Sequence, residues 1–201
     1  MKKTIILILC IICGMTTQAQ NADKARQILD KTATVVNNRA GSSANFTIAG
    51  EKTNTSGKIS IKGNKFMATT PEATIWYNGT TQWTYMKNTE EVNISNPNEA
   101  QQAQMNPYKF ITLYKSGYTL GMKNVSGGYE VHMVAQDQKH NINEMYITVN
   151  SRTYIPTKVR LRQGNKWTTI TISNFKAANL SDAVFTFNSK DFPNAEVIDL
   201  R

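Results

Sequence analysis

The side chains that most often perform catalysis or bind metals are few in this sequence. The chain has two histidines, His132 and His140. Their spacing matches none of the compact metal-binding motifs, and the signatures of zinc proteases, serine hydrolases, P-loops and dinucleotide sites are missing. In a strand, His132 would point away from the face that carries Val131 and Met133, toward solvent. We therefore expect no catalytic residue, no metal site and no cofactor.

The carboxylates do not form an acid and base pair either. Glu90 and Glu91 are adjacent, but neighbours in a strand point to opposite faces and cannot share a substrate proton. Asp191 precedes a Phe-Pro pair and is interpreted as a turn residue. The sequence predicts a protein that is not an enzyme. An enzyme whose catalytic residues meet only in space stays open as an alternative.

Cations form a more regular pattern. Lys158, Arg160 and Arg162 alternate with Val159 and Leu161, so one face of this strand is basic and the other is apolar. Two interpretations stay open. The row is a solubilising outer face, or it is a docking site for acidic protein surfaces or anionic lipid headgroups. Nucleic acid is not an expected partner, because no motif combines basic and aromatic residues in the way such domains do.

Methionine and aromatic residues are prominent among the apolar positions. The methionines beyond the N-terminal segment are Met67, Met86, Met105, Met122, Met133 and Met145, and the tryptophans are Trp76, Trp83 and Trp167. Such residues are common in ordinary cores. Methionine also suits surfaces that adapt to ligands of varying shape, because its side chain is flexible.

The N-terminus has the pattern of an export signal. Lys2 and Lys3 precede an apolar run from Thr4 to Ile12 with seven Ile and Leu residues, and small residues end at Ala19. The run is too short to span a bilayer core of about 30 Å. We expect a signal peptide over residues 1–19, cleaved near Ala19, and a periplasmic product.

Both cysteines, Cys10 and Cys13, lie inside this segment. The mature chain therefore has no thiol for a disulfide, a zinc site or a nucleophile. The residues before each cysteine do not fit a lipidation site, so we expect a protein that is not membrane-anchored. We also expect it to be a monomer. The mature chain carries a formal charge of +7, against +9 for all 201 residues.

Composition and periodicity predict one globular domain over residues 20–201. The chain is 40% hydrophobic and 18% charged, which is ordinary for globular proteins. Asn21 is expected to cap a helix from about Ala22 to Asn37. From Asn45 onward the apolar period is two, which predicts about 10–11 antiparallel strands. A sheet of that many strands must curl, and it encloses more space than its side chains fill. The sequence predicts a β-dominated α+β fold with a cavity.

Turns and middle helices follow from shorter signals. Thr55-Ser56-Gly57, Lys62-Gly63-Asn64 and Tyr77-Asn78-Gly79-Thr80 are predicted hairpin turns. Asn96-Pro97 and Asn106-Pro107 are predicted to start two short helices in the middle of the chain. A last apolar strand is expected from Val184 to Phe187.

Several of these segments, in this order, resemble the outer-membrane lipoprotein carrier family, the LolA-like periplasmic chaperones. The segment from Gly57 to Phe66 is similar to the family's glycine-lysine hairpin, and Ile75 to Tyr85 is similar to its paired aromatic strands. Asn106-Pro107 with the following Phe110-Ile111-Thr112-Leu113 resembles its middle helix, and Phe185-Thr186-Phe187 its closing strand.

The resemblance implies an unclosed antiparallel β-barrel capped by the N-terminal helix and short middle helices. It implies a carrier that takes lipoprotein acyl chains from an inner-membrane release transporter and delivers them to an outer-membrane acceptor. Gly63 and Asn64 stand where the family has Arg and Pro. A divergent carrier of another lipid or glycolipid, or an envelope sensing or protein-binding module, therefore stays open as an alternative.

Inward-facing apolar residues are expected to line the acyl site, with a lid formed by the predicted apolar helix around Tyr108 to Tyr114. The expected lining residues are Phe46, Ile48, Ile59, Ile61, Phe66, Ile75, Trp83, Tyr85, Phe110, Ile111, Leu113, Met122, Met133 and Met145.

Overall fold

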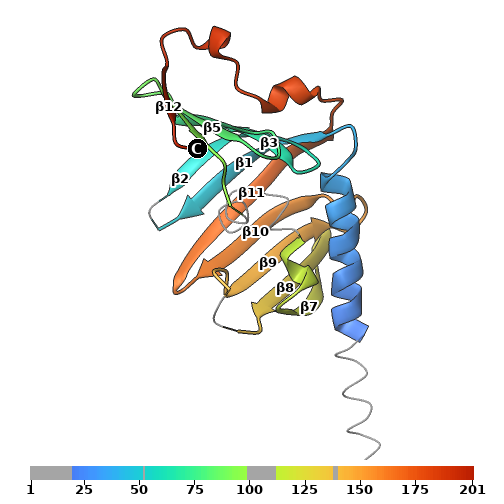
Figure 1. Ribbon diagram of the computed structural model, residues 1–201. Coiled ribbons are helices and arrows are strands. Elements are labelled where there is room, and N and C mark those ends of the chain that lie inside the picture. The colour runs from blue at the N-terminus through green and yellow to red at the C-terminus, as the bar shows by residue number, and fades with distance from the viewer. Residues whose placement is uncertain (1–19, 52, 99–111, 138–139) are drawn as a thin grey trace, which may run out of the picture.

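A computed structural model describes residues 20–51, 53–98, 112–137 and 140–201 of the chain (Figure 1). Within these residues one helix, residues 20–36, precedes twelve strands that form one sheet. The strands are β1 (Ser42–Gly50), β2 (Asn54–Lys62), β3 (Lys65–Thr69), β4 (Ala73–Tyr77), β5 (Gln82–Met86), β6 (Glu91–Ser95), β7 (Tyr118–Val125), β8 (Gly128–Ala135), β9 (Glu144–Asn150), β10 (Pro156–Gln163), β11 (Lys166–Ala177) and β12 (Glu196–Asp199). Three short 3-10 helices are η1 (Leu113–Lys115), η2 (Asp182–Phe185) and η3 (Ser189–Asp191).

The sheet consists of two meanders joined at β1. Its strand order is β12-β6-β5-β4-β3-β2-β1-β11-β10-β9-β8-β7. All neighbours are antiparallel except β12, which runs parallel to β6. The two edge strands, β12 and β7, are not paired with each other, so the sheet is unclosed. This confirms the predicted β-dominated, unclosed fold, with one strand more than the sequence indicated.

The sheet bends so that one face is concave (Figure 1). The N-terminal helix lies along one side of the concave face, while the C-terminal segment after β11 passes over the outer face of the β3–β6 half. The two faces of that half are therefore covered by opposite ends of the chain. Among the described residues no helix is long and apolar enough to cross a bilayer.

The N-terminal helix forms where an apolar stripe was predicted. Ala25, Ile28 and Leu29 are buried, and so are residues 33 and 36 farther along. The predicted cap at Asn21 is wrong, because this residue lies within the helix. Its side-chain Oδ1 instead accepts a hydrogen bond from the backbone N–H of Met122 in β7, at 3.0 Å. The helix is thus tied to the far edge strand of the sheet.

The predicted turn at Thr55-Ser56-Gly57 is also wrong, because these residues lie inside β2. Gly57 is required there for space. A Cβ atom at this position would lie 2.1 Å from the backbone oxygen of Thr69 and 2.8 Å from Cζ of Phe46. The glycine therefore marks a crowded strand position, with the ring of its cross-strand partner Phe46 beside it. The turns predicted at Gly63 and Gly79 are confirmed.

The predicted closing strand from Val184 to Phe187 is wrong. Its first half belongs to η2, which Ser181 caps by accepting a hydrogen bond from the N–H of Ala183. Phe185 is fully buried. The last strand of the sheet is instead β12, a segment of four largely exposed residues (Glu-Val-Ile-Asp) that is too short to show alternation.

Other predictions lie outside the described residues. These are the signal peptide at 1–19 with Cys10 and Cys13, and the part of the predicted middle helices over residues 99–111. Residues 96–98, where the first of these helices was predicted to start, are not helical. After that segment, Leu113–Lys115 forms the single 3-10 turn η1.

Candidate functional site

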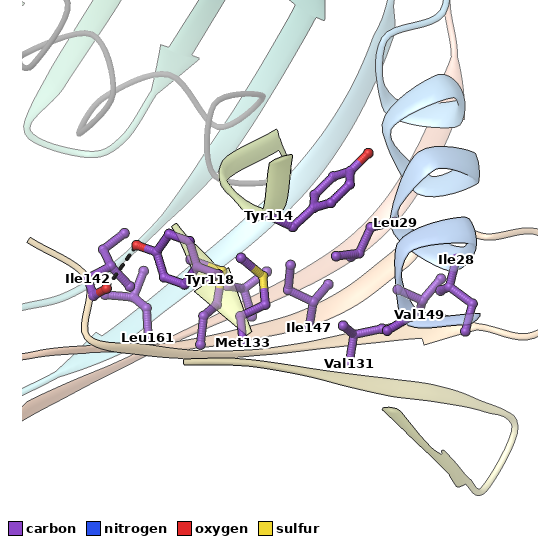
Figure 2. Close-up of a cluster of buried hydrophobic side chains, with 13 residues drawn as sticks. Ile28, Leu29, Tyr114, Tyr118, Val131, Met133, Ile142, Ile147, Val149 and Leu161 are labelled. Carbon is purple, nitrogen blue, oxygen red and sulfur yellow. Dashed lines mark hydrogen bonds between the residues drawn. The ribbon is translucent and has the colours of Figure 1, made fainter. Parts of the chain in front are cut away.

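Two buried clusters hold the helix to the concave face. The first joins Ala25, Ile28 and Leu29 of the helix to strands β7–β10. Figure 2 shows Ile28 and Leu29 pointing to the sheet side chains of Val131, Ile147 and Val149. The second cluster joins Ala33 and Val36 of the helix to Ile61, Phe66 and Tyr77 of β2, β3 and β4. The helix thus covers two separate parts of the sheet.

Two tyrosines, in η1 and at the start of β7, connect these segments to the helix and to the chain before β9. The hydroxyl of Tyr114 donates to Asp30 Oδ1 on the helix. The hydroxyl of Tyr118 donates to the backbone oxygen of Ile142 at 2.9 Å (Figure 2). Burial raises the pKa of Tyr118, so its phenol remains a protonated donor at neutral pH. Both tyrosine rings are buried.

Half-buried apolar side chains lie between the two clusters. We call this set the concave patch: Phe46, Ile48, Ile59, Ile75, Ile170 and Ile172. The strand register places them on one face, because Phe46 pairs with Ile172, and Ile48 pairs with Ile170. Ile59 and Ile75 are both aligned with Ala68 between them, which puts them on one face with each other. The patch therefore spans β4 to β11 across the middle of the sheet.

The residues of the concave patch differ in how they relate to the two clusters. Ile170 and Ile172 pack against the first cluster, and Ile59 and Ile75 against the second. Within the described residues, Phe46 and Ile48 belong to neither cluster. Apolar side chains that are partly exposed and lie outside a packed cluster are candidates for contact with an apolar ligand. The concave patch is our candidate site.

The outer face of the β8–β11 half is polar. Arg162 bonds to Glu144 through its Nε at 3.0 Å and a terminal nitrogen at 2.9 Å. The same carboxylate accepts a hydrogen bond from the Tyr146 hydroxyl, at 2.8 Å, and lies 2.8 Å from Nε2 of His132. The bond from Tyr146, together with those from His132 and Arg162, lowers the pKa of Glu144. These residues form an ion-paired network on an open sheet surface.

The predicted cation row lies on this outer face, opposite Val159 and Leu161. The guanidinium of Arg160 lies 4.9 Å from the ring centre of Trp167 and 5.5 Å from that of Tyr146. His132 stacks on Tyr146 at 4.3 Å, on the face predicted for it. Lys158 is exposed. In the part of the chain that the structure describes, no three His, Cys, Asp or Glu side chains are grouped so as to hold a metal ion.

Comparison with known families decides the identity of the fold. Residues 15–165 match the family described as outer membrane lipoprotein carrier protein LolA. The chain belongs to this family. A comparison with curated protein sequences finds no match.

Solved structures resemble this LolA-family chain in fold. A conserved protein from Thermus thermophilus matches with a TM-score of 0.60 and 15% identity, over 88% of this chain and 99% of that one. A LolA superfamily protein from Nitrosomonas europaea matches with a TM-score of 0.44 and 13% identity, over 81% and 97% of the two chains. An outer membrane lipoprotein-sorting protein domain from Vibrio parahaemolyticus matches with a TM-score of 0.48 and 11% identity, over 83% of this chain and 97% of that one. At 15% identity, the match to the Thermus thermophilus protein shows a similar fold and nothing more.

In this LolA-family chain the predicted lining residues divide into five groups, of which four are described first. Phe46, Ile48, Ile59 and Ile75 lie in the concave patch. Ile61, Phe66, Met133 and Met145 share its face but are buried in the two clusters. Leu113 and Met122 are half-buried at the margin of the first cluster. Phe110 and Ile111 lie outside the described residues.

The remaining two predictions, Trp83 and Tyr85, are wrong because these residues lie on the outer face. Trp83 pairs with Trp76 in β4, whereas the inward Ile75 pairs with Thr84. The apolar residues of β5 do form a buried face. This face is the outer one, and Phe192 of the C-terminal segment covers it. The ring of Phe192 lies 4.6 Å from that of Tyr85 and 5.5 Å from that of Trp76.

Sequence reasoning missed the part of the concave patch that lies on β11. Ile170 and Ile172 alternate with threonine and serine, and this signal was sufficient to place them with Phe46. Phe175 could not be placed by alternation. The β1–β11 register shifts between Ser43 and Asn45, and Asn174 has a φ of 51°. This extra residue in β11 resets the alternation, so Phe175 packs beside the second cluster.

Proposed function

We propose that this chain binds the acyl chains of lipoproteins on the concave patch and carries them across the periplasm toward the outer membrane. The observation that carries the proposal is the half-buried apolar face at Phe46 and Ile48, between two packed clusters of a lipoprotein-carrier fold. The proposed partners are a release transporter at the inner membrane and an acceptor at the outer membrane. The proposed carrier is a monomer without catalytic activity.

The physical basis of binding is removal of hydrocarbon from water. Each buried methylene contributes about 0.8 kcal/mol, so a chain of ordinary length supplies ample gross free energy. The patch residues are already half-buried, so the cargo covers only their remaining exposed area. The net gain on the protein side is therefore limited, which favours release to an acceptor.

The proposal is tested by placing a charge in the patch. Ile48→Asp should abolish uptake of a fluorescent fatty acid, because a carboxylate there would have to be buried against hydrocarbon. The matched control is Thr47→Asp, one residue away on the exposed outer face. A cooperative thermal transition verifies that each variant folds. Equal uptake by the two variants would refute the assignment.

A second candidate, a divergent carrier of another lipid or glycolipid, is favoured by the β2–β3 turn. Gly63 and Asn64 replace the Arg and Pro of the family pattern. The neighbouring lysines instead bind the C-terminal segment, with Lys62 Nζ 3.1 Å and Lys65 Nζ 2.8 Å from the Asp182 carboxylate. Native mass spectrometry of protein purified from its host separates the two, because an acylated peptide and a free lipid differ in mass.

A further inference from the structure

A pocket of about 690 Å³ lies beside the end of the N-terminal helix, away from the concave patch. Residues 34, 35 and 37–39 form one wall, and Ile155 with residues 175–177 of β11 forms the other. Its volume would hold a small molecule, and its mouth is open to solvent. No residue of the concave patch lines it. The pocket is therefore separate from the proposed acyl site.

One part of this pocket is apolar. Val35, Ile155, Phe175 and Ala177 contribute hydrocarbon to its walls. Phe175 reaches the pocket because the extra residue Asn174 turns it to the concave side of the sheet. These side chains come from three separate segments, so the apolar wall is a product of the fold rather than of one helix face.

The other part is cationic. Arg39 and Lys176 line the pocket and are exposed. Neither makes an ion pair with any described residue, whereas Lys62, Lys65 and Arg162 are all paired with carboxylates. Two positive charges without acidic partners attract an anion, and a guanidinium binds phosphate oxygens with good geometry.

Asn37 adds a polar group that lacks a partner. Its Oδ1 is buried and accepts no hydrogen bond from the described residues. A buried acceptor without a donor costs about 1–3 kcal/mol. The same residue lines both the large pocket and a neighbouring one of about 310 Å³ on the Tyr114 side of the helix. A ligand hydroxyl that reached this oxygen after a side-chain rotation would remove the penalty.

We propose that this pocket binds the headgroup of an anionic phospholipid whose phosphodiester carries a hydroxyl-bearing group, as in phosphatidylglycerol. The phosphate lies at the mouth of the pocket, which Arg39 and Lys176 both line. A headgroup hydroxyl donates to Asn37 Oδ1, and the glycerol and first methylenes pack on Phe175 and Ile155. The four features of the pocket, its volume, cations, unpaired acceptor and apolar wall, each match one part of such a molecule.

The test uses short-chain lipids that dissolve as monomers, with affinity measured by isothermal titration calorimetry. Dihexanoyl phosphatidylglycerol should bind at least about tenfold more tightly than dihexanoyl phosphatidylcholine, whose head has no net charge and no hydroxyl. Glycerol phosphate, which lacks the chains, should also bind at least about tenfold more weakly. Equal binding of the two lipids, or equal binding of glycerol phosphate, would overturn the proposal.

Variants locate the site. Arg39→Glu with Lys176→Glu should weaken phosphatidylglycerol at least about tenfold. The matched control, Lys58→Glu with Lys190→Glu, makes the same change in net charge at exposed positions elsewhere and should leave affinity within about twofold. Asn37→Ala should weaken the lipid without lowering the melting temperature, because it removes an unpaired buried acceptor. Equal effects of the two double variants, or unchanged affinity in Asn37→Ala, would contradict this site.

Discussion

Trp76 and Tyr77 are adjacent in β4, yet each is buried by a different end of the chain. Tyr77 packs under the N-terminal helix in the second cluster, with Phe66 and Val36. The ring of Trp76 contacts Phe187 and Phe192 of the C-terminal segment, at centroid distances of 5.6 and 5.5 Å. The β3–β6 half of the sheet is therefore a three-layer structure.

The C-terminal segment should accordingly be a structural element. Phe185 is fully buried, and η2 lies against β3 and β4. Phe185→Ala should lower the free energy of unfolding by about 3–5 kcal/mol, the usual cost of truncating a buried aromatic residue. Val197→Ala, at a side chain that is half exposed in β12, should change it by less than about 0.5 kcal/mol. Urea denaturation measures both, and equal effects would contradict the layered arrangement.

Gly57 should tolerate no side chain. Gly57→Ala would force its Cβ into the backbone of Thr69, so β2 must shift and the unfolding free energy should fall by more than about 1 kcal/mol. Gly121→Ala is the matched strand variant, because a Cβ there meets nothing within 4 Å. It should be neutral or stabilising by about 0.4–1 kcal/mol. Equal melting temperatures of the two variants would show that β2 is not crowded at Gly57.

Variants of Met145 test whether this predicted lining residue belongs to the protein core instead. It is fully buried under the helix. Met145→Ala should therefore cost about 2–5 kcal/mol of stability while the variant, at a temperature where it is folded, retains its fatty-acid affinity. Met145→Leu should cost less than about 1.5 kcal/mol. Loss of affinity in the well-folded Leu variant would place Met145 in the binding site instead.

The outer-face network predicts a specific pH dependence. Hydrogen bonds from Tyr146, His132 and Arg162 lower the pKa of Glu144 below its usual 4.5. A carboxyl whose pKa is depressed by folding stabilises the protein above its unfolded pKa, and this contribution is lost as pH falls through the folded value. Glu144→Gln should therefore lower the melting temperature at about pH 7, and the difference from the parent should shrink toward about pH 3. A difference that stays constant with pH would contradict this account.

Alternation in the sequence predicted the shared face of several candidate residues because it reports burial on one face. Phe46, Ile48, Ile59 and Ile75 do lie together on the concave face, and the family resemblance predicted the unclosed sheet. The same rule failed at Trp83 in β5. Alternation shows that one face is covered but not which one, and here the cover is the distant segment around Phe192.

Other features depend on contacts that a local pattern does not contain. Gly57 has the appearance of a turn residue, but it is needed for the close approach of Thr69. The inward position of Phe175 requires the extra residue at Asn174. The sequence pattern predicted that Met133 and Met145 are buried. It could not show whether the helix or a ligand covers them, because that depends on where the helix lies on the sheet.

Contacts between a bound chain and individual isoleucines test the central claim most directly. The protein can be labelled at isoleucine methyls and titrated with an unlabelled fatty acid, and intermolecular NOEs between chain and methyls can then be recorded. Ile48, Ile59, Ile75, Ile170 and Ile172 report on the concave patch, while Ile142 and Ile147 in the first cluster and Ile198 in β12 serve as internal controls. We predict NOEs to the patch methyls, strongest at Ile48, and none to the three controls. NOEs confined to the controls, or saturating fatty acid without any NOE to Ile48 or Ile170, would contradict the account.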